Sequence, residues 1–193
     1  MPNVVISSIP LSRISASVPE YLLSHEYSTN DIQGNESGSS TPDEQQHLLC
    51  IASAMNLGGL ETDSPLSTVY AGSVPLIPGY FSGVGDLFSA LLLGHFRPPR
   101  DISTSPLQNL KVPSPLATAT AHALYKTHAI LSLTHGSSLM DSLPATDDEL
   151  DAVEPQRKSK RMKGRELKLI QGQDIFRSKD PVEGIRLWEG FWD

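Results

Sequence analysis

Apolar residues gather in a few short runs along this chain, and the spacing within each run predicts its secondary structure. Residues 3–8, NVVISS, form a β-branched run that predicts a buried strand ending in hydroxyl groups. Residues 47–54 (HLLCIASA) and 67–77 (STVYAGSVPLI) predict two strands that pair through the turn-rich segment between them. We expect a late strand within RELKLIQGQDIF, which begins at residue 165.

Two further segments predict helices. The first extends from about Gly85 to about His95 and ends before RPPR, because proline cannot continue a helix. Its apolar residues point in every direction around the axis, which predicts a helix surrounded by protein. The second helix covers residues 114–135, where Ser114 can cap the first turn and Pro115 suits the first helical position.

Two polar tracts interrupt these elements. Residues 10–46 are rich in Ser, Asn, Gly, Pro and acidic residues, and residues 137–165 are first acidic and then basic. Neither tract has enough apolar side chains to offset the entropy lost on ordering, so we predict disordered insertions at both places. The length of 193 residues suits a single domain, and we interpret residues 1–193 as part of one domain with these two insertions.

Composition narrows the possible partners. The net charge of −7 gives the surface as a whole no attraction for nucleic acid or an anionic membrane. The opening MPNVVISSIP lacks the features of a signal peptide, and DLFSALLLGHF is too short to span a bilayer. Cys50 has no second cysteine to pair with, which fits a reducing, cytoplasmic setting. The basic run RKSKRMKGR at 157–165 also leaves the nucleus open, although a solvated loop explains it as well.

The strongest chemical signal is the glycine-rich turn directly before the first helix. Gly83 and Gly85 allow several amide N–H groups to converge at a helix N-terminus, which favours an anion such as phosphate. Asp86 would then lie beside the anion, where a carboxylate can take the proton of an attacking hydroxyl. The residues alone leave a second interpretation open, in which Asp86 is a helix cap beside a tight turn. The histidines show no spacing typical of zinc ligands, so no protein-held metal is predicted.

The sequence SGVGDLFSALLL closely resembles the C-terminal signature of the ribokinase-like superfamily, usually Gly-Thr-Gly-Asp followed by an apolar helix. The order of NVVISS, HLLCIASA, GYFSGVGDLFSALLLGHF, ALYKTHAIL and RELKLIQGQDIF resembles that of eukaryotic pyridoxal kinases, and the fungal ones most. The resemblance implies an α/β fold, a ribokinase-like three-layer α/β/α sandwich. It also implies ATP-dependent phosphorylation of the 5′-hydroxymethyl group of pyridoxal, pyridoxine or pyridoxamine, in pyridoxal 5′-phosphate salvage.

The resemblance assigns roles to the glycine turn. Asp86 falls on the catalytic base of the family, and Gly83, Val84 and Gly85 fall on the anion hole around the transferring phosphoryl group. One departure is Val84, which stands where many members have Thr. The backbone N–H survives this change, but a hydroxyl contact to phosphate is lost, and Ser82 is the neighbouring hydroxyl able to replace part of it.

Other segments match the nucleotide site of the family. Ser7 and Ser8 fall on a strand end that meets the nucleotide and a nearby monovalent cation such as K⁺. Residues 74–82, which begin with Val74, match the segment along the adenine and ribose, and residues 121–127 would form a wall of the adenine pocket. The implied cofactors are ATP and Mg²⁺.

Pyridoxal kinases are much longer than this chain, and their N-terminal half supplies most of the vitamin pocket and the motif that arranges magnesium. We therefore expect this chain to be the C-terminal half, with the remaining part of a parallel central sheet and its helices, and to be inactive alone. The resemblance implies ATP and a B6 vitamer as partners and a homodimer for the full-length enzyme, without nucleic acid or membrane. The alternative is a non-catalytic nucleotide-binding or interaction remnant of such a kinase.

Overall fold

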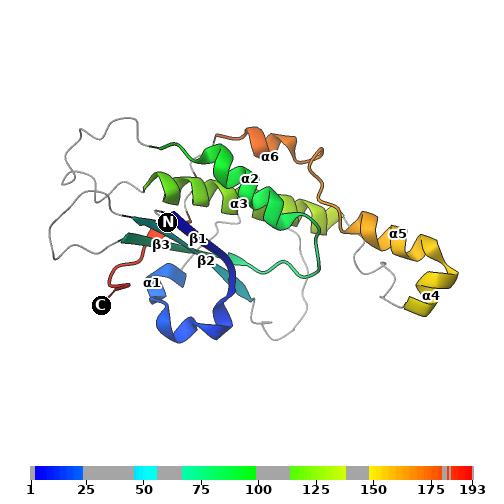
Figure 1. The fold of residues 1–193 in the computed structure, drawn as a ribbon, viewed down its shortest axis with the longest axis horizontal. Coiled ribbons are helices and arrows are strands. Elements are labelled where there is room, and N and C mark those ends of the chain that lie inside the picture. The colour runs from blue at the N-terminus through cyan, green and yellow to red at the C-terminus, as the bar shows by residue number, and fades with distance from the viewer. Residues whose placement is uncertain are drawn as a thin grey trace, which may run out of the picture. The chain divides into compact units, whose positions relative to one another are not determined.

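The computed structural model describes residues 3–23, 46–55, 67–98, 114–137, 148–179, 182 and 184–192 (Figure 1). These residues form a mixed α/β fold, as predicted. They divide into two compact units. Unit 1 comprises Met1–Leu76, Arg97–Ala121 and Glu183–Asp193, and unit 2 comprises Ile77–Phe96 and His122–Val182. Neither unit is a continuous stretch of the sequence.

Unit 1 contains a four-stranded sheet in the order β1-β2-β3-β4, and every pairing is antiparallel. The strands are β1 (Asn3–Pro10), β2 (His47–Met55), β3 (Ser67–Pro75) and β4 (Arg186–Leu187). β2 and β3 pair along their whole length, which confirms the predicted pairing. The parallel arrangement expected for the sheet is wrong for these strands, because β2 and β3 follow each other without the long crossover that parallel pairing requires.

β1 lies at the edge of the described sheet and is not the buried strand that we predicted. Val4 and Ile6 are 43% and 51% exposed. A β-branched composition favours a strand but does not distinguish an edge strand from a central one. The register against β2 shifts between Ile6 and Ile9, so that Ser7 and Ser8 form a bulge.

Unit 1 contains a cluster of buried hydrophobic residues. Val18, Leu22, Leu49 and Ala71 form it, and Trp188 packs against them. Val18 and Leu22 come from the tract at 10–46 for which an insertion is predicted. The described part of this tract forms η1 (Leu11–Arg13), η2 (Ser15–Ser17) and α1 (Glu20–Leu23). Residues 24–45 of this tract lie outside the described residues.

Cys50 on β2 is 1% exposed. Burial raises the pKa of its thiol to about 12, because the interior of the sheet disfavours the thiolate. At neutral pH the side chain is therefore a neutral thiol that contributes to packing.

Unit 2 is built from helices. It contains α2 (Val84–His95), α4 (Asp148–Val153), α5 (Pro155–Gly164) and α6 (Gln173–Arg177), together with most of α3 (Pro115–Ser137). The start and end of α2 agree with the prediction to within one residue. The prediction that α2 is surrounded by protein is wrong, because none of its residues is buried and Leu93 is 76% exposed.

α3 begins as predicted. Pro115 is its first residue, and the Ser114 hydroxyl oxygen accepts a hydrogen bond from the N–H of Ala117 at 3.1 Å. This contact is an N-terminal cap of the kind that the sequence indicates. None of the described helices is long and apolar enough to cross a membrane.

α4 and α5 occupy the tract at 137–165 that was predicted to be an insertion, of which residues 138–147 lie outside the described residues. Asp151 on α4 pairs with Arg161 on α5 and lies 3.6 Å from Nε of Arg157. The hydrogen bond from Arg161, with the charges of both arginines, lowers the pKa of Asp151 despite the opposing effect of burial. Two of the basic residues in the run 157–165, Arg157 and Arg161, therefore form ion pairs between α4 and α5.

The late strand predicted from residue 165 is wrong. The described structure has one isolated parallel bridge, between Ser82 and Glu166, followed by turns and by α6. Contacts to α3 decide this conformation: the N–H of Lys168 donates to the hydroxyl oxygen of Thr134 at 3.1 Å. Tertiary contacts here override the local strand preference.

Candidate active site

The candidate site in unit 2 is the turn that leads into α2. Gly83 is the N-cap residue of α2, with φ at 83°, in the left-handed region that glycine adopts without strain. The helix closes its first turn through the N–H of Leu87, which donates to the carbonyl of Gly83 at 3.0 Å. The N–H groups of Val84, Gly85 and Asp86 come before this bond and have no acceptor within the helix.

Gly85 differs from Gly83 in its backbone conformation. Its φ is not positive, and a Cβ placed on it would meet no other atom within 4 Å. Neither backbone strain nor crowding within the protein therefore requires glycine at this position. The absence of a side chain leaves the backbone open to close approach by another molecule, as in phosphate-binding turns.

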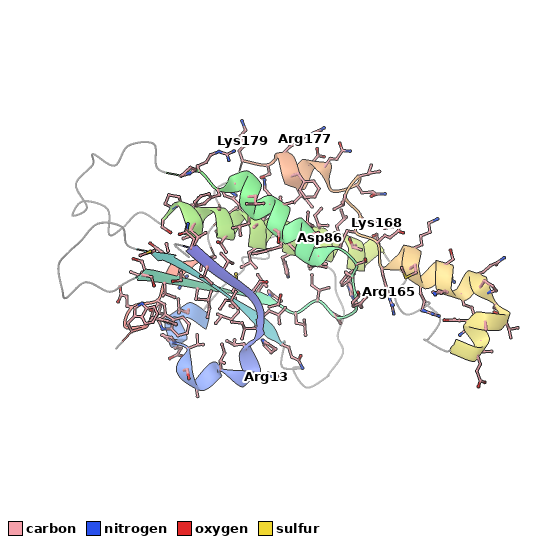
Figure 2. All side chains as sticks on the ribbon, in the orientation of Figure 1. Arg13, Asp86, Arg165, Lys168, Arg177 and Lys179 are labelled. Carbon is pink, nitrogen blue, oxygen red and sulfur yellow. The ribbon has the colours of Figure 1, made fainter. Side chains whose placement is uncertain are left out.

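Asp86 is the third residue of α2 and is exposed (Figure 2). The start of α2 has no capping hydrogen bond from a side chain. Among the described residues, the Asp86 carboxylate makes no hydrogen bond or ion pair. The interpretation of Asp86 as a simple helix cap therefore lacks the contact on which it depends. A carboxylate of this kind is free to accept a proton or a hydrogen bond from a ligand.

The remaining predicted site residues belong to unit 1. Ser7 and Ser8 are exposed in the bulge of β1, and Ser8 has φ at 63°, which is rare for a residue other than glycine. Val74 on β3 pairs with Leu48 and is 7% exposed, so its side chain contributes to the interior of the unit. The structure thus holds Ser82 to Asp86 together in one turn of unit 2, and describes the other three residues within unit 1.

α3 carries a buried cation that the sequence analysis missed. Lys126 is 2% exposed, and its Nζ donates to the carbonyls of Phe176 and Ser178 at 2.8 and 3.0 Å. A signal was available, because Lys126 follows Ala123 by three residues and precedes Ile130 by four. Both of those residues are fully buried, so the helical spacing places Lys126 on the buried face of α3.

Two histidines link α2 to α3. The rings of His95 and His122 stack with their centroids 4.6 Å apart and their planes 13° apart. Burial, and then the charge of Lys126, lower the pKa of His122. The described residues contain no group of three or more His, Cys, Asp or Glu side chains that could hold a metal ion.

No protein-family model matches the chain, and no curated protein matches it. Among solved structures, the chain is similar to pyridoxal kinase from Leishmania donovani in complex with ADP, with a TM-score of 0.47 and 19% identity over 77% of this chain and 37% of that one. It is also similar to the same kinase in complex with ADP and pyridoxine, with a TM-score of 0.45 and 20% identity over 74% of this chain and 35% of that one. The chain is also similar to pyridoxal kinase from Trypanosoma brucei, with a TM-score of 0.38 and 19% identity over 73% of this chain and 33% of that one. The chain thus spans little more than a third of these kinases.

Proposed function

We propose that this chain carries the phosphoryl-transfer residues of an ATP-dependent kinase that phosphorylates the 5′-hydroxymethyl group of pyridoxal, pyridoxine or pyridoxamine. The observation that supports this proposal most directly is the open turn from Gly83 to Asp86. Within the described part of the chain, it combines unpaired N–H groups, a glycine that the fold does not require, and an exposed carboxylate without a partner. The vitamin substrate comes from the resemblance of the motifs to pyridoxal kinases.

The chemistry assigns a task to each group in the turn. The substrate hydroxyl oxygen attacks the γ-phosphorus, the bond from that phosphorus to the bridging oxygen of ADP breaks, and the hydroxyl proton passes to the Asp86 carboxylate. A positioned base contributes roughly 10²–10⁴-fold to the rate of such a step. The N–H groups of Val84 and Gly85 would donate to the phosphoryl oxygens, and losing one donor of this type costs roughly 3–4 kcal/mol.

The bulge in β1 supports a nucleotide-binding role for Ser7 and Ser8. Bulges and positive φ values at residues other than glycine concentrate at functional sites, because local strain persists only where the surrounding structure maintains it. We propose that these two hydroxyls serve the nucleotide and a monovalent cation such as K⁺. We propose that Mg²⁺ accompanies the ATP phosphates, and the resemblance assigns the motif that arranges it to the N-terminal half of such kinases.

A second candidate function is a non-catalytic nucleotide-binding remnant of such a kinase. Val84 favours it, because the hydroxyl that many related kinases place there is missing. Both candidates predict nucleotide binding at the turn, and they differ in turnover. For the complete kinase we propose a homodimer in the cytoplasm.

Binding and turnover are tested separately. ADP is titrated into the full 193-residue chain by calorimetry, with Gly85→Ala as the variant that obstructs the turn. We expect weak binding that the substitution reduces. Pyridoxal 5′-phosphate formation is then measured with the N-terminal half of a pyridoxal kinase added in trans. Turnover that requires both parts supports the kinase, binding without turnover supports the remnant, and absence of ADP binding would contradict both.

A further inference from the structure

Residues 165–178, which we call the strap, are fastened to α3. Near the start of the strap, the N–H of Lys168 donates to the Thr134 hydroxyl, and Thr134 is fully buried. Further along, Gly172 lies so close to α3 that a Cβ on it would be 2.1 Å from Cδ1 of Ile130. The strap therefore follows the surface of α3 without room for a side chain at this point.

The end of the strap is held by the buried Lys126. Its ammonium group donates to the carbonyls of Phe176 and Ser178, at and just beyond the end of α6. A cation is favourable at a helix C-terminus, where carbonyls lack partners within the helix. Because the ammonium is removed from water, these hydrogen bonds compensate a large desolvation cost, and breaking them would leave a buried charge without partners.

The other end of the strap holds the loop that enters the glycine turn. The carbonyl of Arg165 accepts the N–H of Ser82 at 3.0 Å, and Ser82 forms a parallel bridge with Glu166. The guanidinium carbon of Arg165 lies 5.4 Å from the centroid of the Tyr80 ring, within the range of a cation–π contact. Arg165 thus contacts the loop through both its backbone and its side chain. Figure 2 labels Arg165 and Asp86.

The backbone of Arg165 is itself held by α5. Its N–H donates to the carbonyls of Arg161 and Met162, at 3.2 and 3.1 Å, which completes the last turn of that helix. Arg165 is therefore the point where α5, the strap and the loop before α2 meet. Gly83 follows Ser82 directly and has no side chain to restrict its rotation, so the direction of the turn depends on what holds Ser82.

We propose that Arg165 is a positioning residue, which sets the direction of the N–H groups in the glycine turn by holding Ser82 and Tyr80. Its catalytic consequence rests on the proposed kinase function, but the contact itself does not. In this proposal Arg165 makes no contact with the reacting atoms. It acts through the loop, and the strap transmits the rigidity of α3 and α5 to the turn.

The test is amide hydrogen exchange, followed by NMR on the full chain. The reporter is the N–H of Ser82, and the N–H of Phe96, which bonds to Leu92 at the far end of α2, reports general loosening. Arg165→Ala should accelerate exchange at Ser82 by about two- to fivefold, the effect that one exposed cation–π contact corresponds to. Tyr80→Ala should do the same, and the double variant should add little, because both changes remove one contact.

Three variants sharpen the result. Arg165→Lys should retain part of the protection, since an ammonium also binds an aromatic face, and Tyr80→Phe should retain it because the ring remains. Arg177→Ala is the matched control, because among the described residues the side chain of this strap arginine bonds only to Gln173, on its own helix. It should leave exchange at Ser82 unchanged.

Equal exchange at Ser82 in Arg165→Ala and the unsubstituted chain would overturn the proposal, and so would equal acceleration at Phe96. An ADP titration separates this result from the fate of the proposed function. If the unsubstituted chain binds ADP, Arg165→Ala should weaken the affinity by about the same factor as it accelerates exchange. If it does not bind ADP, the kinase proposal fails while the exchange data still decide whether Arg165 positions the turn.

Discussion

The first turns of α2 and α3 both have N–H groups without acceptors in the helix, and the two helices differ in what satisfies these groups. At the start of α3, Ser114 bonds to the N–H of Ala117, and Pro115 removes one donor altogether. At the start of α2, no side chain caps the helix, and Asp86 has no partner among the residues that the structure describes. Glycine is a tolerated N-cap residue that costs only about a few tenths of a kcal/mol relative to serine, so α2 gives up a small amount of the stability that α3 retains. The difference supports our proposal that the first turn of α2 binds a ligand.

The substitution Asp86→Asn has the largest expected effect, and it tests whether the start of α2 has a role that the start of α3 lacks. In the assay with the complementing half, we expect turnover to fall at least about 100-fold, because the amide cannot accept the hydroxyl proton. ADP binding should stay unchanged. Glu20→Gln, which neutralises an exposed carboxylate in the first turn of α1, is the control and should leave turnover intact. Turnover within a few-fold of the unsubstituted protein would remove Asp86 from the reaction.

The two glycines provide a matched pair. Gly83→Ala forces an L side chain into the left-handed region, which should cost about 1–2 kcal/mol of folding free energy in urea denaturation. Gly85→Ala meets no other atom and places a better helix former in α2, so stability should be unchanged or rise by up to about 1 kcal/mol. ADP binding should nevertheless weaken in Gly85→Ala. Normal ADP affinity in that variant would argue against a phosphate at the turn.

Ser114→Ala tests the other side of the comparison. Loss of the hydroxyl acceptor for the N–H of Ala117 should reduce the free energy of unfolding by about 1 kcal/mol. Ser114→Asp should restore it, because aspartate is an equally good cap. Neither change should alter ADP binding. An effect of Ser114→Ala on ADP affinity that Ser114→Asp does not reverse would contradict a purely stabilising role.

The smallest expected effect concerns the other end of α2, where His95 stacks on His122. The pKa of His122 is lowered in the folded state, so the neutral ring is the form that the fold favours. The stability it contributes is complete above the ordinary pKa of about 6.5 and is lost as the pH falls through the lowered value. NMR titration of the His122 ring should show a midpoint below that of an unfolded peptide. In His122→Phe, this pH dependence of stability should disappear.

The sequence was informative where local rules decide the structure. The capping pair Ser114 and Pro115 set the start of α3, and the turn-rich segment between two strand-forming runs predicted that β2 and β3 pair. It failed where long-range contacts decide. Val4 and Ile6 are typical of any strand, and only the order of strands in the described sheet places them at an edge. The strap looked like a strand because its contacts with α3 do not show in local spacing.

The candidate site followed the same division. The turn at Gly83 depends on neighbouring residues, and the glycine motif predicted it. The exposure of Asp86 was not predicted, because α2 was expected to be surrounded by protein. Arg165 lies far from the glycine turn in the sequence, so the motif could not include it. The basic run at 157–165 does not show which of its residues contacts Tyr80. Lys126 was missed because lysine is usually exposed, although its helical spacing pointed inward.

The burial of Cys50 makes its rate of alkylation a measure of how often the sheet of unit 1 opens. It is the only cysteine in the sequence, it lies inside β2, and its thiol has a pKa of about 12. Alkylation requires the thiolate, so a reagent such as iodoacetamide can react only in molecules whose sheet has opened. The rate of labelling therefore counts opening events of unit 1 without any substitution or dye. Measured with and without ADP, the labelling rate would show whether the nucleotide slows the opening of the sheet.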